Sequence, residues 1–250
     1  MLSNYHTHTK RCFHATGEDR QYVEKAIESG LKILGFSDHA PYIFDKNYYS
    51  DYRMYPSDID DYCSSVLKLK KEYARDIEIR LGFELEYYEN THQKTMEFLR
   101  SYNPEYIILG QHYIIDERDG YYAYRLSREE LLIRYVNECI AGLKTGDFIY
   151  LAHPELAGFC CTPEVCEREY RRLLQFAKDN NFPIELNGYG FIRNRHYPDK
   201  RLFELAKIIG NKVIVGIDAH NPSNISPTVY SGLNNLVKDL NLNMINKLDI

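Results

Sequence analysis

Two histidines near the N-terminus stand one residue apart, a spacing that suits the binding of a cation. His6 ends a short apolar run and His8 follows it, and side chains two positions apart on a strand point the same way. Both imidazoles can therefore reach one ion. Near the C-terminus, Asp218 and His220 repeat this spacing. Either pair alone occurs by chance on strand ends, so neither identifies a metal site by itself.

The same residue types recur at the ends of other predicted strands. Short apolar runs predict strands at 2–6, 32–37, 77–85, 105–112, 147–152, 183–187 and 212–217. All but the sixth, which ends in Asn187, deliver a histidine or an acid: His6, His8, Asp38, His39, Glu84, Glu86, His112, His153, Asp218 and His220. In a parallel barrel the carboxyl ends of the strands meet at one rim, so these side chains are expected together. Cations keep crowded imidazoles neutral, which indicates a metal centre.

Amphipathic runs between the predicted strands carry helix signals. Ser127 and Glu130 have the spacing of a capping box, and Thr162 followed by Pro163 predicts a second helix start. Alternating strands and helices predict an α/β fold with a parallel sheet. The chain length and the lack of a nucleotide-binding fingerprint favour a closed barrel, as a single domain over residues 1–250.

Composition excludes several classes of protein. The chain has 250 residues, with 44% hydrophobic and 27% charged residues, which is typical of a packed globular domain rather than a disordered or fibrous one. A net charge of −5 argues against a nucleic-acid partner. No apolar run approaches the ~18 residues of a membrane span, and no signal segment is recognised, so a cytoplasmic location is expected. The six cysteines lack paired CxxC spacing and are expected to be structural. An oligomer is possible but not indicated.

The motifs, taken in order from residue 6 to residue 220, resemble those of the PHP (polymerase and histidinol phosphatase) superfamily. The matching segments are His6-x-His8, His14, Ser37-Asp38-His39, Gly82-x-Glu84, His112, Ala152-His153-Pro154 and Asp218-Ala219-His220. The resemblance implies a distorted (β/α)7 barrel, a TIM-like fold, with a trinuclear metal site at the C-terminal ends of the strands.

Carried over position by position, the resemblance implies three ion sites. The first comprises His6, His8, Glu84 and Asp218; the second Glu84, His112 and His153; the third His14, His39 and His220. Some family members have an acid in place of His14. Asp38 becomes a candidate for orienting a ligand. Nitrogen and oxygen ligands without thiolate suit three divalent transition-metal ions, namely zinc, iron or manganese.

Hydrolysis of a phosphomonoester is the chemistry that such a centre would support. Water bridging two ions loses a proton near neutral pH and attacks phosphorus. Glu84 would bridge the ions, and Asp218 or His220 would supply the proton of the leaving alkoxide. Arg193 and Arg195 follow the sixth predicted strand and Arg11 lies between His8 and His14. These three arginines are candidates for phosphate binding; a solvated basic loop is the alternative for the first two.

The chain further resembles the histidinol-phosphate phosphatase branch in its size, in the insertion after SDH and in the YP loop after strand six. That resemblance implies a small phosphorylated metabolite as partner, L-histidinol phosphate, hydrolysed to L-histidinol and phosphate in histidine biosynthesis. Residues of the segment 43–56 are candidates to contact its amine and imidazole: Asp45, Tyr48, Tyr49, Asp51 and Tyr52.

Three other functions remain open. They are a phosphoesterase for phosphotyrosine, a sugar phosphate or a nucleotide phosphate; a non-catalytic metal-stabilised module; and a metal-free, pH-sensitive histidine cluster. His92 is expected to be a solvated residue at a helix start, and His196 is not expected at the site.

Overall fold

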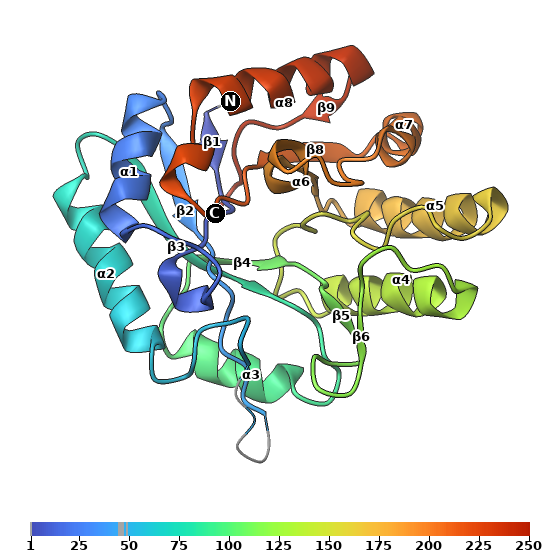
Figure 1. Ribbon diagram of the computed structural model, residues 1–250, viewed down its shortest axis with the longest axis horizontal. Helices are drawn as coiled ribbons and strands as arrows, with labels where there is room; N and C mark the ends of the chain where they lie inside the picture. The colour runs from blue at the N-terminus through green and yellow to red at the C-terminus, as the bar shows by residue number, and fades with distance from the viewer. Residues whose placement is uncertain (1, 45–47, 49) are drawn as a thin grey trace.

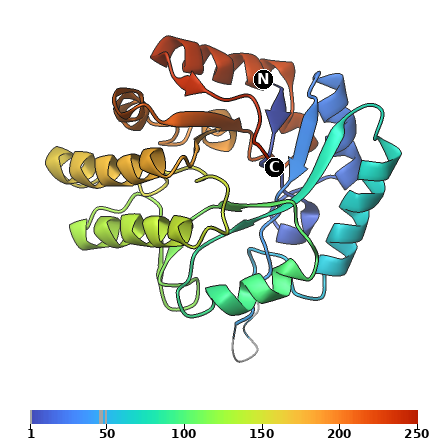
Figure 2. The same ribbon diagram turned by 180° about the vertical axis from the view of Figure 1, so that it is seen from behind.

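Parallel strands occupy the middle of the molecule and helices surround them (Figures 1 and 2). The computed structural model describes residues 2–44, 48 and 50–250. Asp45 and Tyr49, two of the residues expected to contact substrate, lie outside the described residues. Mixed α/β architecture with a parallel sheet, as predicted, is confirmed.

The parallel strands form two sheets. In the first, the strands are hydrogen-bonded in chain order: β1 (Ser3–Asn4), β2 (Ile33–Phe36), β3 (Glu78–Leu85) and β4 (Tyr106–Leu109). In the second they are β7 (Ile184–Asn187), β8 (Lys212–Gly216) and β9 (Asn243–Met244). Every pairing within these two sheets is parallel, so the carboxyl ends of neighbouring strands lie on the same side.

The strand predicted at 147–152 is reduced to a bridge residue. Leu151 pairs with Leu109 on one side and with Ile184 on the other, so this segment joins the two sheets. The amide of Leu151 donates to the carbonyl of Pro183 at 3.1 Å. Proline has no N–H to return to the ladder, which explains why regular pairing with β7 does not extend further toward residue 147.

The curled sheet also brings the first and last predicted strands together. Thr7 forms a parallel bridge with Ala219, the amide of His8 donates to the carbonyl of Ala219 at 2.9 Å, and the amide of Ala219 donates to the carbonyl of His6 at 3.2 Å. The C-terminal segment also lies beside β1, since Ser3 Oγ donates to the carbonyl of Asn246 at 2.6 Å.

Most of the helices cover the outer face of the sheet (Figure 1). These are α1 (Asp19–Glu28), α2 (Ile59–Glu72), α3 (His92–Arg100), α4 (Glu129–Lys144), α5 (Pro163–Asp179), α7 (Lys200–Ile209) and α8 (Pro227–Leu240). The short α6 (Gly188–Ile192) instead follows directly on the carboxyl end of β7, and short 3-10 turns lie at Lys10–Cys12 and Pro222–Asn224. The main core lies between helices and strands. A separate cluster packs among the strands themselves, where the Tyr106 hydroxyl donates to the carbonyls of Tyr5 and Phe36.

Two local predictions have opposite outcomes. Thr162 caps α5 by accepting from the amide of Val165, with Pro163 in the first turn, as predicted. The capping box at Ser127 and Glu130 is wrong, because α4 begins at Glu129 after an extended Arg128 that makes no side-chain cap. The amide of Leu126 donates to the carbonyl of Ala157 at 2.7 Å, and this tertiary contact ties down the chain just before Ser127.

The segment 114–126 contains a short antiparallel hairpin that was not predicted, formed by β5 (Tyr113–Ile114) and β6 (Tyr121–Tyr122).

Among the described residues, no helix has both the length and the apolar character needed to cross a membrane.

Candidate metal centre

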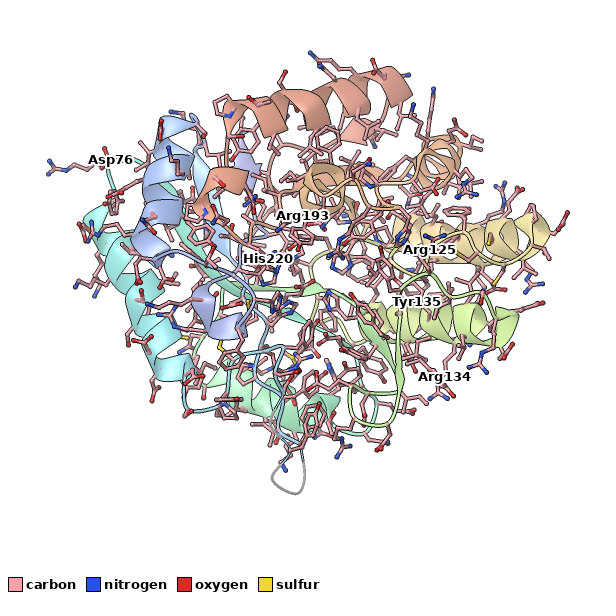
Figure 3. All side chains as sticks on the ribbon, in the orientation of Figure 1. Asp76, Arg125, Arg134, Tyr135, Arg193 and His220 are labelled. Carbon is pink, nitrogen blue, oxygen red and sulfur yellow. The ribbon has the colours of Figure 1, made fainter. Side chains whose placement is uncertain are left out.

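A cavity of about 150 Å³ opens at the carboxyl ends of the strands. Seven of its lining residues are sequence-predicted ligands: His14, His39, Glu84, His112, His153, Asp218 and His220. The others are Tyr52, Tyr122, Leu156, Tyr189, Arg195 and Tyr197. Figure 3 labels His220 near the centre of the molecule. The strand ends therefore bring together side chains from both ends of the chain.

The four residues expected around the first ion converge on one point. The Nε2 atoms of His6 and His8 each lie 3.3 Å from Glu84 Oε2. They lie 3.6 and 3.1 Å, respectively, from Asp218 Oδ1. Two ligands that each bind an ion at about 2.1 Å are themselves about 3 to 3.4 Å apart at ordinary coordination angles. The spacing of these atoms is therefore close to that of ligands sharing a cation.

The same four atoms are buried and lack a hydrogen-bond partner within the described part of the chain: His6 Nε2, His8 Nε2, Glu84 Oε2 and Asp218 Oδ1. Buried polar atoms are normally satisfied, so a convergent set of unsatisfied donor atoms needs an explanation. Nitrogen and oxygen donors of this kind fit zinc, iron or manganese. The residues present thus fit a divalent transition-metal ion.

The other oxygen of Glu84 faces the residues expected at the second site. Oε1 lies 2.9 Å from His153 Nε2 and 3.6 Å from His112 Nε2. One carboxylate thus has its two oxygens directed toward two neighbouring sets of imidazoles. A bridging carboxylate requires this placement.

The three histidines expected at the third site lie side by side. The ring centroid of His14 is 5.2 Å from that of His39 and 4.8 Å from that of His220. Nitrogens of His39 and His220 also lie within 4.8 Å of a nitrogen of His8. The Cys12 sulfur lies within 4.8 Å of ring nitrogens of His14 and His220, a neighbour that the sequence analysis did not place here.

Carboxylates outside the cavity hold three of the imidazoles by their far nitrogens. His6 Nδ1 lies 2.8 Å from Glu185 Oε1, and His112 Nδ1 lies 2.9 Å from Glu86 Oε1. His8 Nδ1 lies 3.3 Å from Asp38, the orienting contact expected from the sequence. Because an ionised carboxylate only accepts hydrogen bonds, each Nδ1 donates to its carboxylate and each Nε2 is left to face Glu84.

Glu185 is the main residue of the site that sequence reasoning missed. It is fully buried and also accepts from the amide of His153 at 3.1 Å and from Asn187 Nδ2 at 2.8 Å. A Cβ on Gly216 would lie 1.8 Å from Glu185 Oε1, so glycine is required there. The available signal was an acid in the middle of the apolar run PIELN, where a charge needs a partner.

The electrostatics of the cluster link its carboxylates to its imidazoles. Burial tends to raise the pKa of Glu84, but His6, His112 and His39 outweigh burial and hold this pKa well below its usual range. Burial tends to lower the pKa of His6, but Glu185, Asp218 and Glu84 raise it well above its usual value. A histidine binds a metal ion as a neutral imidazole, so a cation competes with protons for these groups.

Two of the expected ligands are among the residues with a left-handed backbone. His153 and Asp218 adopt φ values of 28° and 55°, in a region that residues with a Cβ rarely occupy. Such strain persists where the surrounding structure imposes it, and it clusters at functional sites. A Cβ on Gly110 would lie 1.9 Å from Glu84 Oε1, so the chain passes directly against the Glu84 carboxylate.

The three candidate phosphate-binding arginines lie in different places. Arg195 lines the cavity, with its guanidinium 4.8 Å from the ring centroid of Tyr189. Arg193, at the end of α6 (Figure 3), stacks on Tyr189 at 5.6 Å and is absent from the described lining of the cavity. Arg11 also lies outside that lining, since Asp19 and Asp61 hold its guanidinium at 2.9 and 2.7 Å.

The two remaining histidines lie outside the centre. The prediction of a solvated His92 is wrong: its side chain is buried and its Nε2 lies 2.8 Å from Asp147 Oδ2, a hydrogen bond between α3 and the loop before residue 149. His196 Nε2 donates to the carbonyl of Leu156 at 2.9 Å. His196 therefore packs behind the cavity wall, as its expected absence from the site implies.

Of the described residues expected to contact substrate in the segment 43–56, one lines the cavity. The ring of Tyr52 lies 4.5 Å from that of His39 and its hydroxyl donates to Glu86 at 2.9 Å. Tyr48 lines a second cavity beside this loop, and Asp51 is exposed.

Comparison with known proteins finds relatives that match most of this chain. A "probable histidinol-phosphatase" of Deinococcus radiodurans is 24% identical over 238 residues, which cover 90% of this chain and 88% of the relative. The crystal structure of a putative histidinol phosphatase from Listeria monocytogenes superposes with a TM-score of 0.76 at 22% identity, covering 92% of this chain and 99% of that chain.

A second solved structure is the histidinol phosphate phosphatase of Lactococcus lactis, complexed with zinc, L-histidinol and phosphate. It superposes with a TM-score of 0.73 at 17% identity, covering 98% of this chain and 95% of that chain. At these identities the likeness shows a shared fold. The model of the PHP domain family matches residues 4–188, and this chain therefore belongs to the PHP domain family.

Proposed function

We propose that this protein is a metal-dependent phosphomonoesterase that hydrolyses L-histidinol phosphate to L-histidinol and phosphate, a step of histidine biosynthesis. The observation that carries the proposal is the convergence of four unpartnered buried donor atoms, on His6, His8, Glu84 and Asp218, beside a cavity. The names of the relatives support the choice of substrate.

The proposed architecture is a single-domain, distorted (β/α)7 barrel. Seven parallel segments would form it: β1 to β4, the segment around Leu151, β7 and β8. The bridges of Leu151 to Leu109 and Ile184, and of Thr7 to Ala219, support closure of the ring.

Three ion sites are proposed, with the ligands that the sequence predicts. The first comprises His6, His8, Glu84 and Asp218; the second Glu84, His112 and His153; the third His14, His39 and His220. When bound, divalent transition-metal ions supply positive charge that offsets the charge on phosphoryl oxygens and activates water. The protein orients the ligands through Glu185, Glu86 and Asp38.

The chain's own residues bind and orient the phosphate. Arg195 is the proposed phosphate ligand among the three candidates, because its guanidinium reaches the cavity lining. Asp218 and His220 line the same cavity, with Nδ1 of His220 3.2 Å from Asp218 Oδ1. One of these two groups is proposed to deliver the proton to the leaving alkoxide oxygen.

The rest of the cavity suits a small substrate that carries polar nitrogens. Four tyrosines, Tyr52, Tyr122, Tyr189 and Tyr197, line it, and their rings and hydroxyls can pack on an imidazole and accept from an amine. A volume of about 150 Å³ admits a metabolite more readily than a folded phosphoprotein.

A panel of phosphomonoesters tests the proposal. Protein loaded with zinc or manganese is assayed for phosphate release from L-histidinol phosphate, phosphotyrosine, glucose 6-phosphate and AMP. We expect kcat/KM for histidinol phosphate to exceed the others by about 10²-fold or more, because buried polar groups penalise substrates that leave them unpaired. A preference for another ester would overturn the substrate. Stoichiometric metal binding without turnover of any ester would indicate the non-catalytic alternative.

A further inference from the structure

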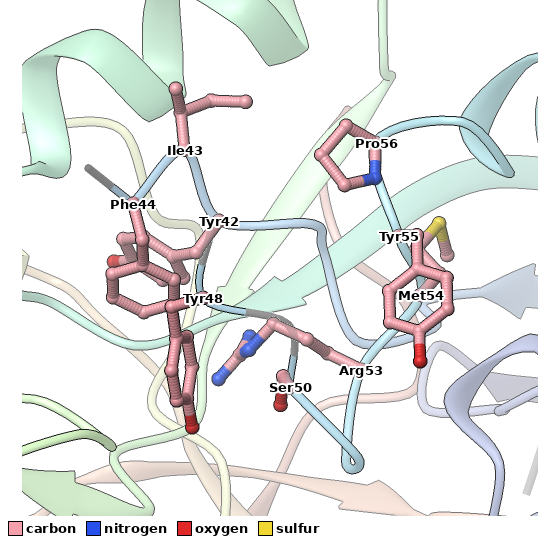
Figure 4. A pocket seen from close by; sticks show the side chains of 9 residues that line it. All are labelled: Tyr42, Ile43, Phe44, Tyr48, Ser50, Arg53, Met54, Tyr55 and Pro56. Atoms are coloured by element: carbon pink, nitrogen blue, oxygen red, sulfur yellow. The ribbon is translucent and has the colours of Figure 1, made fainter. Parts of the chain in front are cut away.

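Arg53 is a fully buried cation that does not line the metal cavity. It lies in the segment between β2 and α2 and is 1% exposed. Its guanidinium lies 5.1 Å from the ring centroid of Tyr42 and 4.9 Å from that of Tyr52. Figure 4 shows its side chain reaching from its loop toward Tyr42 and Tyr48, along the wall of a second cavity of about 190 Å³.

Each nitrogen of this guanidinium donates a hydrogen bond within the protein. Nε and Nη2 donate to Glu117 Oε2 at 2.9 and 2.7 Å, Nη2 also donates to Glu86 Oε2 at 2.9 Å, and Nη1 donates to the carbonyl of Ala40 at 3.0 Å. Removing a charge from water is costly unless it is paired and hydrogen-bonded. Arg53 is thus held in one position by partners from three separate segments.

Those partners connect Arg53 to the candidate metal centre. Glu86 accepts from Arg53 with Oε2, and its Oε1 lies 2.9 Å from His112 Nδ1 and accepts from the Tyr52 hydroxyl at 2.9 Å. Ala40 directly follows His39 in the chain. A continuous path of three contacts therefore leads from Arg53 through Glu86 and His112 to Glu84, which His112 Nε2 faces at 3.6 Å.

The formal charges explain why such a path needs an arginine. Glu86 and Glu117 are two buried carboxylates that share one guanidinium, and two like charges this close would repel each other without it. The planar guanidinium can donate to both acids and to a carbonyl at once, whereas a lysine ammonium is a point charge. Arg53 leaves one Glu86 oxygen free for His112.

We propose that Arg53 is a positioning residue for the ion site formed by Glu84, His112 and His153, acting by fixing Glu86 against His112 Nδ1. This inference rests on the proposed function. Arg53 also joins two loops, because it directly follows Tyr52 in its own loop and its guanidinium donates to Glu117 in another.

Arg53→Lys is the test variant, because it keeps the positive charge and removes the forked geometry. Arg80→Lys is the matched control: Arg80 also pairs with two carboxylates, Glu78 and Glu105, but lies at the other end of β3. Metal-stripped proteins are titrated with Co²⁺ and followed by visible absorption. We expect Arg53→Lys to lower the affinity for one of the ions about 10- to 100-fold, which is the usual effect of losing a contact that orients a metal ligand. Arg80→Lys should bind every ion with the affinity of the wild type.

Two further measurements separate positioning from general damage. The ¹H–¹⁵N imidazole spectrum of the zinc-loaded protein should show a protonated Nδ1 on His112 in the wild type and an altered His112 signal in Arg53→Lys. In Arg53→Ala, millimolar guanidinium should restore binding of the weakened ion, while urea, a neutral molecule of similar shape, should not.

The outcomes are distinguishable. A folded Arg53→Lys protein that binds every ion with wild-type affinity overturns the inference, and so does equal rescue by urea. Failure of the wild-type protein to bind any Co²⁺ contradicts the proposed function instead.

Discussion

His8 Nε2 lies 3.1 Å from Asp218 Oδ1, although the two residues come from opposite ends of the chain. The two atoms are close but form no hydrogen bond with each other, and neither has a hydrogen-bond partner elsewhere in the described residues. Proximity without hydrogen bonding is the relationship expected of two ligands that face a common cation. It makes the first proposed ion site the most directly testable part of the molecule.

Replacing Glu84 with glutamine should remove the bridge between two ion sites. The amide keeps the size of the side chain but loses the charge that faces His6, His8 and His153. We expect phosphatase activity to fall by about 10³-fold or more, since several kcal/mol of transition-state stabilisation depend on the ions. Metal content by elemental analysis should fall in parallel. Glu78→Gln, on the same strand but exposed, is the control, and wild-type turnover by Glu84→Gln would refute the assignment.

Glu185→Gln should weaken metal binding although it replaces none of the proposed metal ligands. The carboxylate holds His6 Nδ1 and the amide of His153, and an amide oxygen accepts less strongly from an imidazole. Loss of such a contact costs about 10- to 100-fold in metal affinity or activity. Titration of metal-stripped protein measures it. The buried Glu169 pairs with Arg168 and Arg172 on α5, so Glu169→Gln should lower stability while leaving metal affinity intact; equal effects of both variants would contradict the prediction.

Alanine substitutions at Arg195 and Arg193 should differ sharply in their effect on kcat/KM, although the two residues stand only two positions apart. Both guanidinium groups lie over the ring of Tyr189, but Arg195 lines the cavity and Arg193 is absent from its described lining. A charge-assisted hydrogen bond contributes about 1.5–3 kcal/mol, so Arg195→Ala should lower kcat/KM by about 10- to 100-fold, and Arg193→Ala should change it by less than about threefold. Competitive inhibition by inorganic phosphate should weaken in the first variant only. A larger loss of kcat/KM in Arg193→Ala than in Arg195→Ala would contradict this assignment and would place the phosphate site nearer the surface.

The cysteines should react with alkylating agents according to burial. All six lie among the described residues and are free thiols. Burial raises the pKa of Cys63, on α2, to about 12, so at pH 8 its thiolate fraction is about 10³-fold below that of an ordinary thiol.

Iodoacetamide at pH 8 should therefore label the partly exposed Cys160 long before Cys63, and raising the pH should accelerate labelling of Cys63. Peptide mass spectrometry before and after unfolding in urea measures the order. Rapid labelling of Cys63 in the folded protein would show that α2 opens readily.

Much of the fold could be predicted from local pattern. Apolar runs located the parallel strands β1 to β4, β7 and β8 but not β9, and Thr162 with Pro163 located the start of α5. Two of the misses share one cause. The capping box at Ser127 and the strand at 147–152 were overridden by contacts with Ala157 and Pro183, which come from parts of the chain that no local window includes.

The sequence by itself determined which residue types stand at the strand ends and in what order, because strand periodicity and parallel pairing place His6, Glu84, His153 and Asp218 on one rim. Only the tertiary structure decided which other side chains support them. Glu185 and Arg53 are polar residues whose directions depend on neighbours distant in the chain. Likewise, the sequence could not separate Arg195 from Arg193, since the direction of a loop side chain is set by packing rather than by spacing.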